Sequence, residues 1–219
     1  MRDKNIEKYY NRRALEYEQI YFREMPDRRK EIEDEVSFVK EICSGKDVLD
    51  IACGTGYWTE RISETANSIT ACDISKEMLD VAKKKQYHCP VQFVRSNLNH
   101  LPFAPDSFDI VILGFWFSHH PRQDYQNLFK SISFPLKPKC PIWIIDNNPP
   151  AEGPTMHSHH LDEFGNNFKS RYLDNQEEFV ILKNYFEKEE LIEIFTPYFR
   201  IERLIYGTYY WSVVLYSII

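Results

Sequence analysis

The nine residues at positions 48–56, VLDIACGTG, constrain the fold of this chain more than any other segment. A short aliphatic run contains an acid, Asp50, and a tight turn with Gly54 and Gly56 follows before a helical pattern begins at Tyr57. Because glycine has no Cβ, the turn can adopt positive φ and a ligand can approach its backbone closely. A strand, a glycine turn and a helix in this order indicate the first unit of a nucleotide-binding α/β sheet.

The spacing after this turn argues against one class of nucleotide-binding enzyme. A dinucleotide fingerprint requires a third glycine three residues after the second. Thr59 occupies that position, and reading from Ala52 instead places Tyr57 there. An NAD-dependent oxidoreductase is therefore the least favoured function.

Strand patterns alternate with helical patterns along the chain. Short β-branched and aliphatic runs are separated by stretches with apolar residues three and four positions apart. This alternation predicts a parallel sheet with right-handed crossovers. The expected strands span 47–51, 68–72, 91–95, 108–117 and 142–145, and an antiparallel hairpin of 199–205 and 209–217 closes the sheet.

We expect one domain with four parts. Two helices occupy 1–44, a cofactor-binding core spans 45–146, an insertion or cap spans 147–185, and a closing helix and hairpin span 186–219. The insertion combines a loop over 147–167, whose composition is typical of a mobile segment, with a small hairpin of 171–173 and 178–183. The apolar stripe expected on the first helix consists of Ile6, Tyr10, Ala14, Tyr17 and Tyr21.

Charge and cysteine content limit the partners and the compartment. The net charge of −6 argues against a nucleic-acid partner, because phosphate binding needs a basic face. The sequence shows no signal peptide and no apolar run of transmembrane length, so we expect no membrane association. The five cysteines lack C-x-x-C spacing, which predicts reduced thiols in a cytoplasmic protein.

A histidine-rich stretch is the one candidate for a metal site. His157, His159 and His160 lie in the insertion, within a loop that contains Pro and Gly but no cysteine. Such a loop makes a weak metal cage, and a solvated loop is the favoured interpretation. We therefore expect no metal.

The turn resembles motif I of the class I S-adenosylmethionine (SAM)-dependent methyltransferases, acid-x-Gly-x-Gly-x-Gly. Asp50 supplies the acid, and Ala52 stands at the first glycine, where limited backbone clearance suffices. The stretch 101–109, with its Leu-Pro-Phe start and Phe-Asp end, also resembles this family. The resemblance covers roughly 40–219 and is strongest over 48–146. It implies a Rossmann-like, doubly wound, seven-stranded, mostly parallel sheet with a C-terminal antiparallel hairpin, an N-terminal helical lid and an insertion after strand five.

The same resemblance assigns parts of SAM to the strand ends. Asp73 would accept hydrogen bonds from both ribose hydroxyls, and Asn97, where the family usually has an acid, would contact the adenine amino group. Asp50 would support the loop or the methionine ammonium. The complete expected cofactor set is Asp50, Ala52, Gly54, Gly56, Asp73, Ile74, Met78, Asn97, Leu98, Gly114 and Phe115.

Methyl transfer from a sulfonium is an in-line displacement with an activated leaving group, so the protein mainly aligns the acceptor and excludes water. A general base is needed only when the acceptor is protonated. His119 and His120 follow the fourth strand beside the expected methyl position and are candidate bases, although helix capping or packing is an equally good interpretation. Tyr10 is a candidate substrate-pocket residue on the N-terminal helix, although a plain core stripe is at least as good an interpretation.

The sequence favours SAM-dependent methylation of a small molecule, on an oxygen, nitrogen or carbon that it does not specify. The alternative is a SAM-binding sensor or partner subunit without catalysis, because the cofactor site and the chemistry use nearly separate residues. An enzyme acting on RNA or protein is disfavoured by the acidic charge. The oligomeric state does not follow from the sequence.

Overall fold

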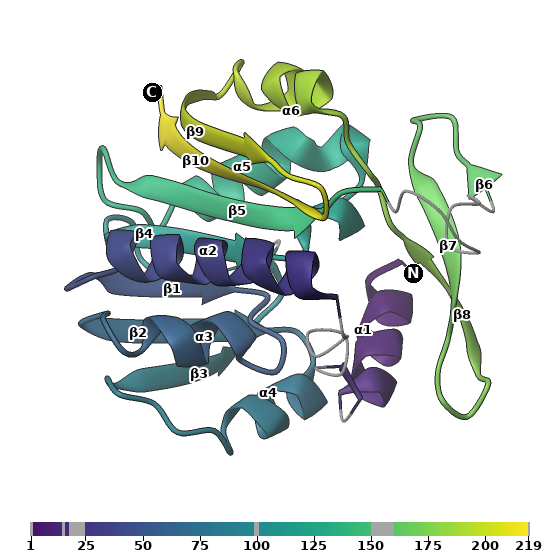
Figure 1. Ribbon diagram of the computed structural model, residues 1–219, viewed down its shortest axis with the longest axis horizontal. Helices are drawn as coiled ribbons and strands as arrows, with labels where there is room; N and C mark the ends of the chain where they lie inside the picture. Colours follow the sequence, from purple (N-terminus) through teal and green to yellow (C-terminus); the bar gives the residue numbers. More distant parts are fainter. Residues whose placement is uncertain (1, 15, 18–24, 99–100, 150–159, 219) are drawn as a thin grey trace.

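The computed structural model describes residues 2–14, 16–17, 25–98, 101–149 and 160–218, and it contains a seven-stranded sheet with helices on both faces (Figure 1). The strand order is β3-β2-β1-β4-β5-β10-β9, in which only β10 runs against the others. The strands are β1 (Asp47–Ile51), β2 (Ser68–Asp73), β3 (Val91–Arg95), β4 (Ile110–Gly114), β5 (Pro141–Asn147), β9 (Phe199–Tyr206) and β10 (Tyr210–Ser217).

Two apolar layers hold helices to the sheet. Alternate residues of each strand face opposite sides, so Val111 and Leu113 of β4 join the cluster that contains α5 and α6, whereas Ile110 and Ile112 join the cluster that contains α2, α3 and α4. Because both faces are covered, β4 is apolar along its whole length, and β1 and β5 are mostly apolar. The helices are α1 (Arg2–Arg13), α2 (Pro26–Ile42), α3 (Tyr57–Ile62), α4 (Lys76–Ala82), α5 (Tyr125–Ser133) and α6 (Lys188–Phe195).

The strand order reverses between β1 and β4, where the chain crosses from β3 to the other side of β1. Ligands of open α/β sheets bind at such a switch point, outside the carboxyl ends of the strands. Figure 1 shows α1 lying at these strand ends, between the sheet and a smaller antiparallel sheet. This cap sheet consists of β6 (His160–Leu161), β7 (Asn167–Tyr172) and β8 (Glu178–Leu182).

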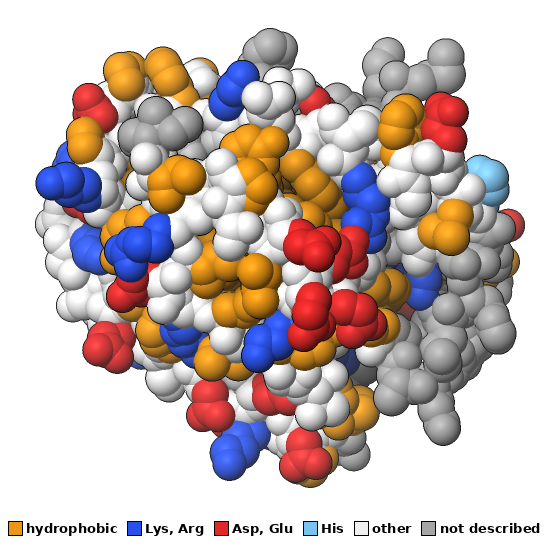
Figure 2. Space-filling model, turned by 90° about the horizontal axis from the view of Figure 1, so that it is seen from above, with side chains coloured by type: hydrophobic (Ala, Val, Ile, Leu, Met, Phe, Trp, Pro, Cys, Tyr) orange, Lys and Arg blue, Asp and Glu red, His pale blue; other side chains and the backbone are white. Residues whose placement is uncertain are grey.

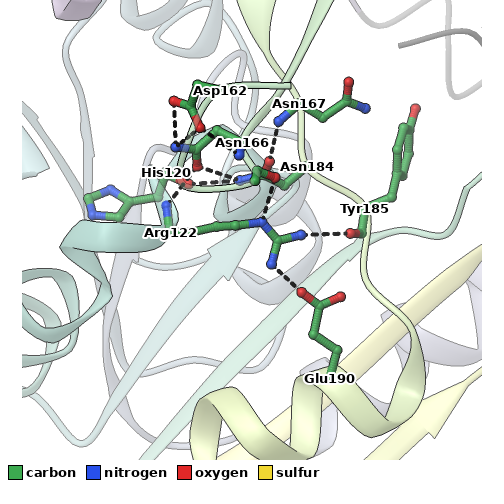
Figure 3. Close-up of polar contacts among 9 residues, drawn as sticks. His120, Arg122, Asp162, Asn166, Asn167, Asn184, Tyr185 and Glu190 are labelled. Carbon is green, nitrogen blue, oxygen red and sulfur yellow. Dashed lines mark hydrogen bonds and ion pairs between the residues drawn. The ribbon is translucent and has the colours of Figure 1, made fainter. Parts of the chain in front are cut away.

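A polar network fastens the cap sheet to the body of the protein (Figure 3). The backbone N–H of Arg122 donates to Asn166 Oδ1 at 2.8 Å, and its guanidinium donates to the carbonyls of Gly165 and Tyr185 and pairs with Glu190 of α6. Asn184 is fully buried, and its amide donates to the carbonyl of His120 at 3.2 Å. The cap therefore has a fixed orientation over the strand ends.

The structure confirms the expected sheet, its closing hairpin and the insertion after β5. It corrects two boundaries. The fourth strand was expected over 108–117 but ends at Gly114, because Phe115 adopts a left-handed conformation (φ 59°) and Phe117–His119 forms a 3-10 turn, η3. The irregular loop expected over 147–167 is too long, because β6 pairs with the start of β7.

The N-terminal stripe is only partly helical. The helix α1 ends at Arg13, so Ala14 and Tyr17 lie beyond it, and Tyr21 lies outside the described residues. Among the helices of the described chain, none has the length and hydropathy to cross a bilayer.

The turn between β9 and β10 depends on an acid of α2. Both carboxylate oxygens of Glu31 accept backbone N–H groups of this turn, from Thr208 at 2.7 Å, Tyr209 at 2.9 Å and Tyr210 at 3.2 Å. A Cβ on Gly207 would lie 2.7 Å from Glu31 Oε2, so glycine is needed there for close approach. One carboxylate thus joins a helix to the edge of the sheet.

Replacing Glu31 with alanine should lower the free energy of unfolding by about 2 kcal/mol, because three backbone donors lose a charged acceptor. Urea denaturation measures this change. The matched control is Glu33→Ala on the exposed face of the same helix, which should change stability by less than about 0.5 kcal/mol. Equal effects of the two substitutions would contradict the role given to Glu31.

Candidate functional site

The turn after β1 contains three residues in the left-handed region. Ala52 (φ 55°), Gly54 (φ 57°) and Gly56 (φ 80°) alternate with residues of ordinary φ. Glycine adopts this region freely, whereas an L-residue pays about 1–2 kcal/mol. Ala52, interpreted from sequence as needing only limited clearance, therefore also carries backbone strain. Such strain at a strand end is typical of a functional site.

Gly56 is required for packing as well as for conformation. A Cβ at this position would lie 2.8 Å from the hydroxyl oxygen of Tyr87 and 3.2 Å from the Cβ of Ala82 at the end of α4. At Gly54, by contrast, a Cβ would meet nothing within 4 Å, so the space beside that glycine is open. The turn is packed on one side and clear on the other.

Asp73, at the end of β2, ties the turn to the next helix. Its carboxylate accepts the backbone N–H of Gly54 at 2.9 Å and that of Ser75 at 2.8 Å. Burial raises the pKa of Asp73 to about 6, although these N–H groups act in the opposite direction. Each carboxylate oxygen keeps further acceptor capacity, so Asp73 can still bind ligand hydroxyls.

Asp50 lies near the carboxyl end of the central strand β1. Its side chain is buried, and the residue is 1% exposed. Its Oδ2 accepts from the Thr59 hydroxyl at 2.5 Å, whereas Oδ1 is buried and has no hydrogen-bond partner in the described chain. Desolvation, with the nearby Asp73 charge, raises the pKa of Asp50 to about 7. An unsatisfied buried acceptor is costly, so a donor or a cation next to Oδ1 would stabilise this arrangement.

A cavity opens at the carboxyl ends of β1, β2, β3 and β4. Together with the open space at its mouth, it measures about 730 Å³. Its walls come from the turn after β1, the end of β2, the segments after β3 and β4, and α1. The lining residues are Ile6, Tyr10, Tyr17, Ile51, Ala52, Gly54, Cys72, Asp73, Ile74, Met78, Ser96, Asn97, Leu98, Gly114, Phe115 and Trp116.

Nine of the eleven expected cofactor residues line this cavity, and Asp50 and Gly56 do not. Gly114 also makes room for a neighbouring side chain, because a Cβ there would lie 2.3 Å from Trp58 Nε1. Sequence reasoning did not assign Ile6 or Ser96 to the site. Ser96 could have been found from its place next to Asn97, directly after the third strand, and Ile6 from its place four residues before Tyr10 on the same helical stripe.

Tyr10 lines the cavity and its hydroxyl lies 2.9 Å from His119 Nε2. The other ring nitrogen, Nδ1, lies 2.6 Å from the carbonyl oxygen of Leu182. Because that carbonyl can only accept, His119 carries its proton on Nδ1, and Nε2 accepts from the Tyr10 hydroxyl. Burial and the nearby Lys183 charge lower the pKa of His119 to about 3. His119 is therefore a neutral residue that orients Tyr10, and a weak base.

His120 does not line the cavity. Its ring lies between Trp116 and Tyr125, and Nε2 lies 3.2 Å from the carbonyl oxygen of Asp124 in the turn η4 (Arg122–Asp124). The structure thus gives His120 the helix-packing position that was the alternative interpretation. Its expected catalytic role has no geometric support.

A buried ion pair lies behind Tyr10 and His119, and sequence reasoning did not assign it to the site. Lys183 Nζ donates to Asp146 Oδ1 at 2.8 Å and to the Ser118 hydroxyl at 2.6 Å. Asp146 Oδ2 accepts the Ser118 backbone N–H at 2.9 Å. Asp146 was recognisable as an acid at the end of β5, but its partner lies in the cap, which no sequence pattern connects to that strand.

No cluster of three metal-ligating side chains occurs within the described parts of the chain. His160 is exposed in β6, and His157 and His159 lie outside the described residues.

The middle of the chain is similar to known methyltransferases. Residues 48–139 match the family model described as a methyltransferase domain. Demethylmenaquinone methyltransferase of Lactococcus lactis subsp. lactis is 34% identical over 114 residues, covering 49% of this chain and 44% of that protein. The enzyme of the same name from Bacillus velezensis is 31% identical over 127 residues, covering 55% and 54%. The chain thus spans about half the length of the curated relatives it matches.

Solved structures extend the likeness over the whole chain. DhpI in its SAH complex has a TM-score of 0.76 at 23% identity, covering 98% of this chain and 96% of that one. The PH0226 protein of Pyrococcus horikoshii OT3 has a TM-score of 0.71 at 21% identity, covering 92% and 98%. These likenesses establish the fold, and with the family match they confirm the resemblance to class I SAM-dependent methyltransferases.

The two glycines of the turn should respond differently to alanine. Gly54→Ala should cost about 1–2 kcal/mol of stability through backbone strain alone. Gly56→Ala should cost about 1–3 kcal/mol more, because the new methyl overlaps Tyr87 and Ala82. Urea denaturation of both variants checks the order. A Gly54→Ala variant that is as unstable as Gly56→Ala would refute the packing argument.

Nitrogen NMR of the histidine side chains should find His119 neutral and protonated on Nδ1 between about pH 5 and pH 8. Its lowered pKa and its contacts with Leu182 and Tyr10 both predict this state. Tyr10→Phe should shift the Nε2 resonance by removing its donor. His119→Gln identifies the signal, and titration of that signal near pH 6.5 would overturn the assignment.

Proposed function

We propose that this chain, with its methyltransferase domain over residues 48–139, transfers a methyl group from SAM to a small-molecule acceptor. One observation carries the proposal: nine of the eleven residues expected from motif I and the following strand ends line a single cavity at the switch point of the sheet. Residues from five separate segments converge there. A fold-level likeness alone would not require that convergence.

The residues present fit SAM. The open side of the turn at Gly54 gives a ligand access to bare backbone, and Asp73 beside it has acceptor capacity for ribose hydroxyls. The unsatisfied Oδ1 of Asp50 suits a nearby ammonium group, either directly or through water. Bound SAM would supply an activated methyl group on a sulfonium. Aromatic side chains at the cavity favour such a positive centre, and they include Tyr10, Tyr17, Phe115 and Trp116.

The protein contributes to catalysis by positioning the methyl acceptor. His119 holds the Tyr10 hydroxyl by accepting a hydrogen bond from it, which leaves the lone pairs of the Tyr10 oxygen available as acceptors. With a pKa of about 3, His119 does not remove protons at neutral pH. We therefore expect an acceptor whose nucleophilic atom needs no strong base from His119, so that its orientation determines the rate.

We expect the protein to act in the cytoplasm and without nucleic acid. The five cysteines are all free thiols, as in a reducing compartment. On the face seen in Figure 2, acidic side chains gather over α6 and the basic ones are dispersed, so that face offers no phosphate-binding surface.

Calorimetry with S-adenosylhomocysteine and 5′-methylthioadenosine tests the cofactor site, because only the first ligand carries the amino-acid part. Asp73→Ala should weaken both ligands about tenfold or more, whereas Asp50→Asn should weaken only S-adenosylhomocysteine. Binding of methylthioadenosine should weaken as the pH falls through about 6, where Asp73 gains a proton. A wild-type protein that binds neither ligand at millimolar concentration would overturn the proposal.

A methyl-transfer assay over a panel of small acceptors then separates an enzyme from a SAM-binding sensor. Binding without any transfer would favour the sensor. Glu33→Ala serves as a control for both experiments, since this exposed side chain of α2 does not line the cavity.

A further inference from the structure

The cap sheet turns positively charged side chains inward. In β7, Lys169 and Arg171 alternate with residues of the outer face, and Lys183 follows β8 on the inner side. Lys169 is 2% exposed and Lys183 is 6% exposed. The other inward residues of the two strands, Phe179 and Ile181, pack with Tyr9 in a small apolar cluster. The inner face is thus apolar at one end and cationic at the other.

The three cations lie close together. The Lys169 ammonium lies 4.5 Å from the centre of the Tyr185 ring, and the Lys183 ammonium lies 5.8 Å from it. Arg171 forms a hydrogen bond with the Tyr185 side chain. Burial and the charges of Arg171 and Lys183 lower the pKa of Lys169 to about 8. We call Lys169, Arg171 and Lys183 the cation cluster.

The nearby negative charge does not balance the cation cluster. Asp146 forms its ion pair with Lys183, and its second oxygen already accepts the Ser118 N–H. Within the described residues, no carboxylate forms an ion pair with Arg171. Concentrated like charge in a partly desolvated site is unfavourable unless an anion binds there. The apolar half of the same face shows that this sheet can pack inward without charge.

The cation cluster adjoins the cavity through two residues. Arg171 and Lys183 are both close enough to lower the pKa of His119, whose Nε2 holds the Tyr10 hydroxyl. Tyr10 itself lines the cavity near Gly114 and Trp116. An acceptor placed against the end of β4 would therefore extend toward the cap sheet and its cations.

We propose that the cation cluster binds an oxyanion carried by the methyl acceptor, so the substrates are small molecules with a carboxylate, phosphate or phosphonate group. This proposal rests on the proposed function. The planar guanidinium of Arg171 suits bidentate contact with such a group, and Lys169 adds a point charge beside it. The remainder of the acceptor lies against Tyr10 and the aromatic wall.

Titration calorimetry in saturating S-adenosylhomocysteine, with methylphosphonate, acetate and acetamide as probes, tests the anion site. These probes are similar in size, so a preference for the two anions over acetamide reports charge recognition, and the better anion identifies the source. Arg171→Gln should weaken anion binding about tenfold or more, and Arg171→Lys should weaken it less. Arg200→Gln on β9, an exposed arginine paired with Glu202, is the matched control and should change nothing.

The outcomes separate this proposal from the previous one. Wild-type protein that binds S-adenosylhomocysteine but shows no anion preference at tens of millimolar, or an Arg171→Gln variant with unchanged anion affinity, overturns the anion site alone. Loss of S-adenosylhomocysteine binding in the wild type contradicts the proposed function itself. Lys169→Met preserves side-chain length, and it should weaken anion binding while leaving the affinity for S-adenosylhomocysteine and the melting temperature nearly unchanged, even if Arg171→Gln fails to fold.

Discussion

The left-handed turn between β1 and α3 is the constraint on which the site depends. Three positive-φ residues in five positions bring the chain from the sheet into a helix within one turn, and they leave backbone open at Gly54 while Gly56 packs against α4. The same turn donates the N–H that fixes Asp73 at the end of β2. A longer or more regular connection would move the carboxylate and close the cavity.

Asp50 and Asp73, the two buried acids beside this turn, lower the stability of the folded chain at neutral pH, and both can bind ligand groups. The folded pKa values of Asp50 and Asp73, about 7 and about 6, lie above the ordinary 3.8. The stability that these groups contribute is complete at acidic pH, below their unfolded pKa, and is lost as the pH rises through 6 to 7. At neutral pH the two carboxylates thus destabilise the folded chain, and a positively charged ligand beside Asp50 would reduce that cost.

The core could be predicted because its signals are local. The strands β1 and β3 follow from short patterns, and the structure reproduces them. The end of β4 could not be predicted, since apolar residues continue to Phe117 while the backbone turns at Phe115. His119 and His120 look equivalent in the sequence. Their different roles arise from partners in the cap and in η4, which only the three-dimensional fold brings near.

The large sheet and the layer formed by α1 and the cap sheet contribute different residues to the site. The residues expected to bind the cofactor lie mostly at strand ends, whose positions the sheet determines. Tyr10, which lines the cavity, comes from α1, and α1 contacts the cap sheet outside the large sheet. Anchors such as Arg122 hold that layer in place, and its inward side chains can vary without disturbing the turn. If α1 and the cap contact the acceptor, substrate choice lies in the part of the chain where sequence patterns are weakest.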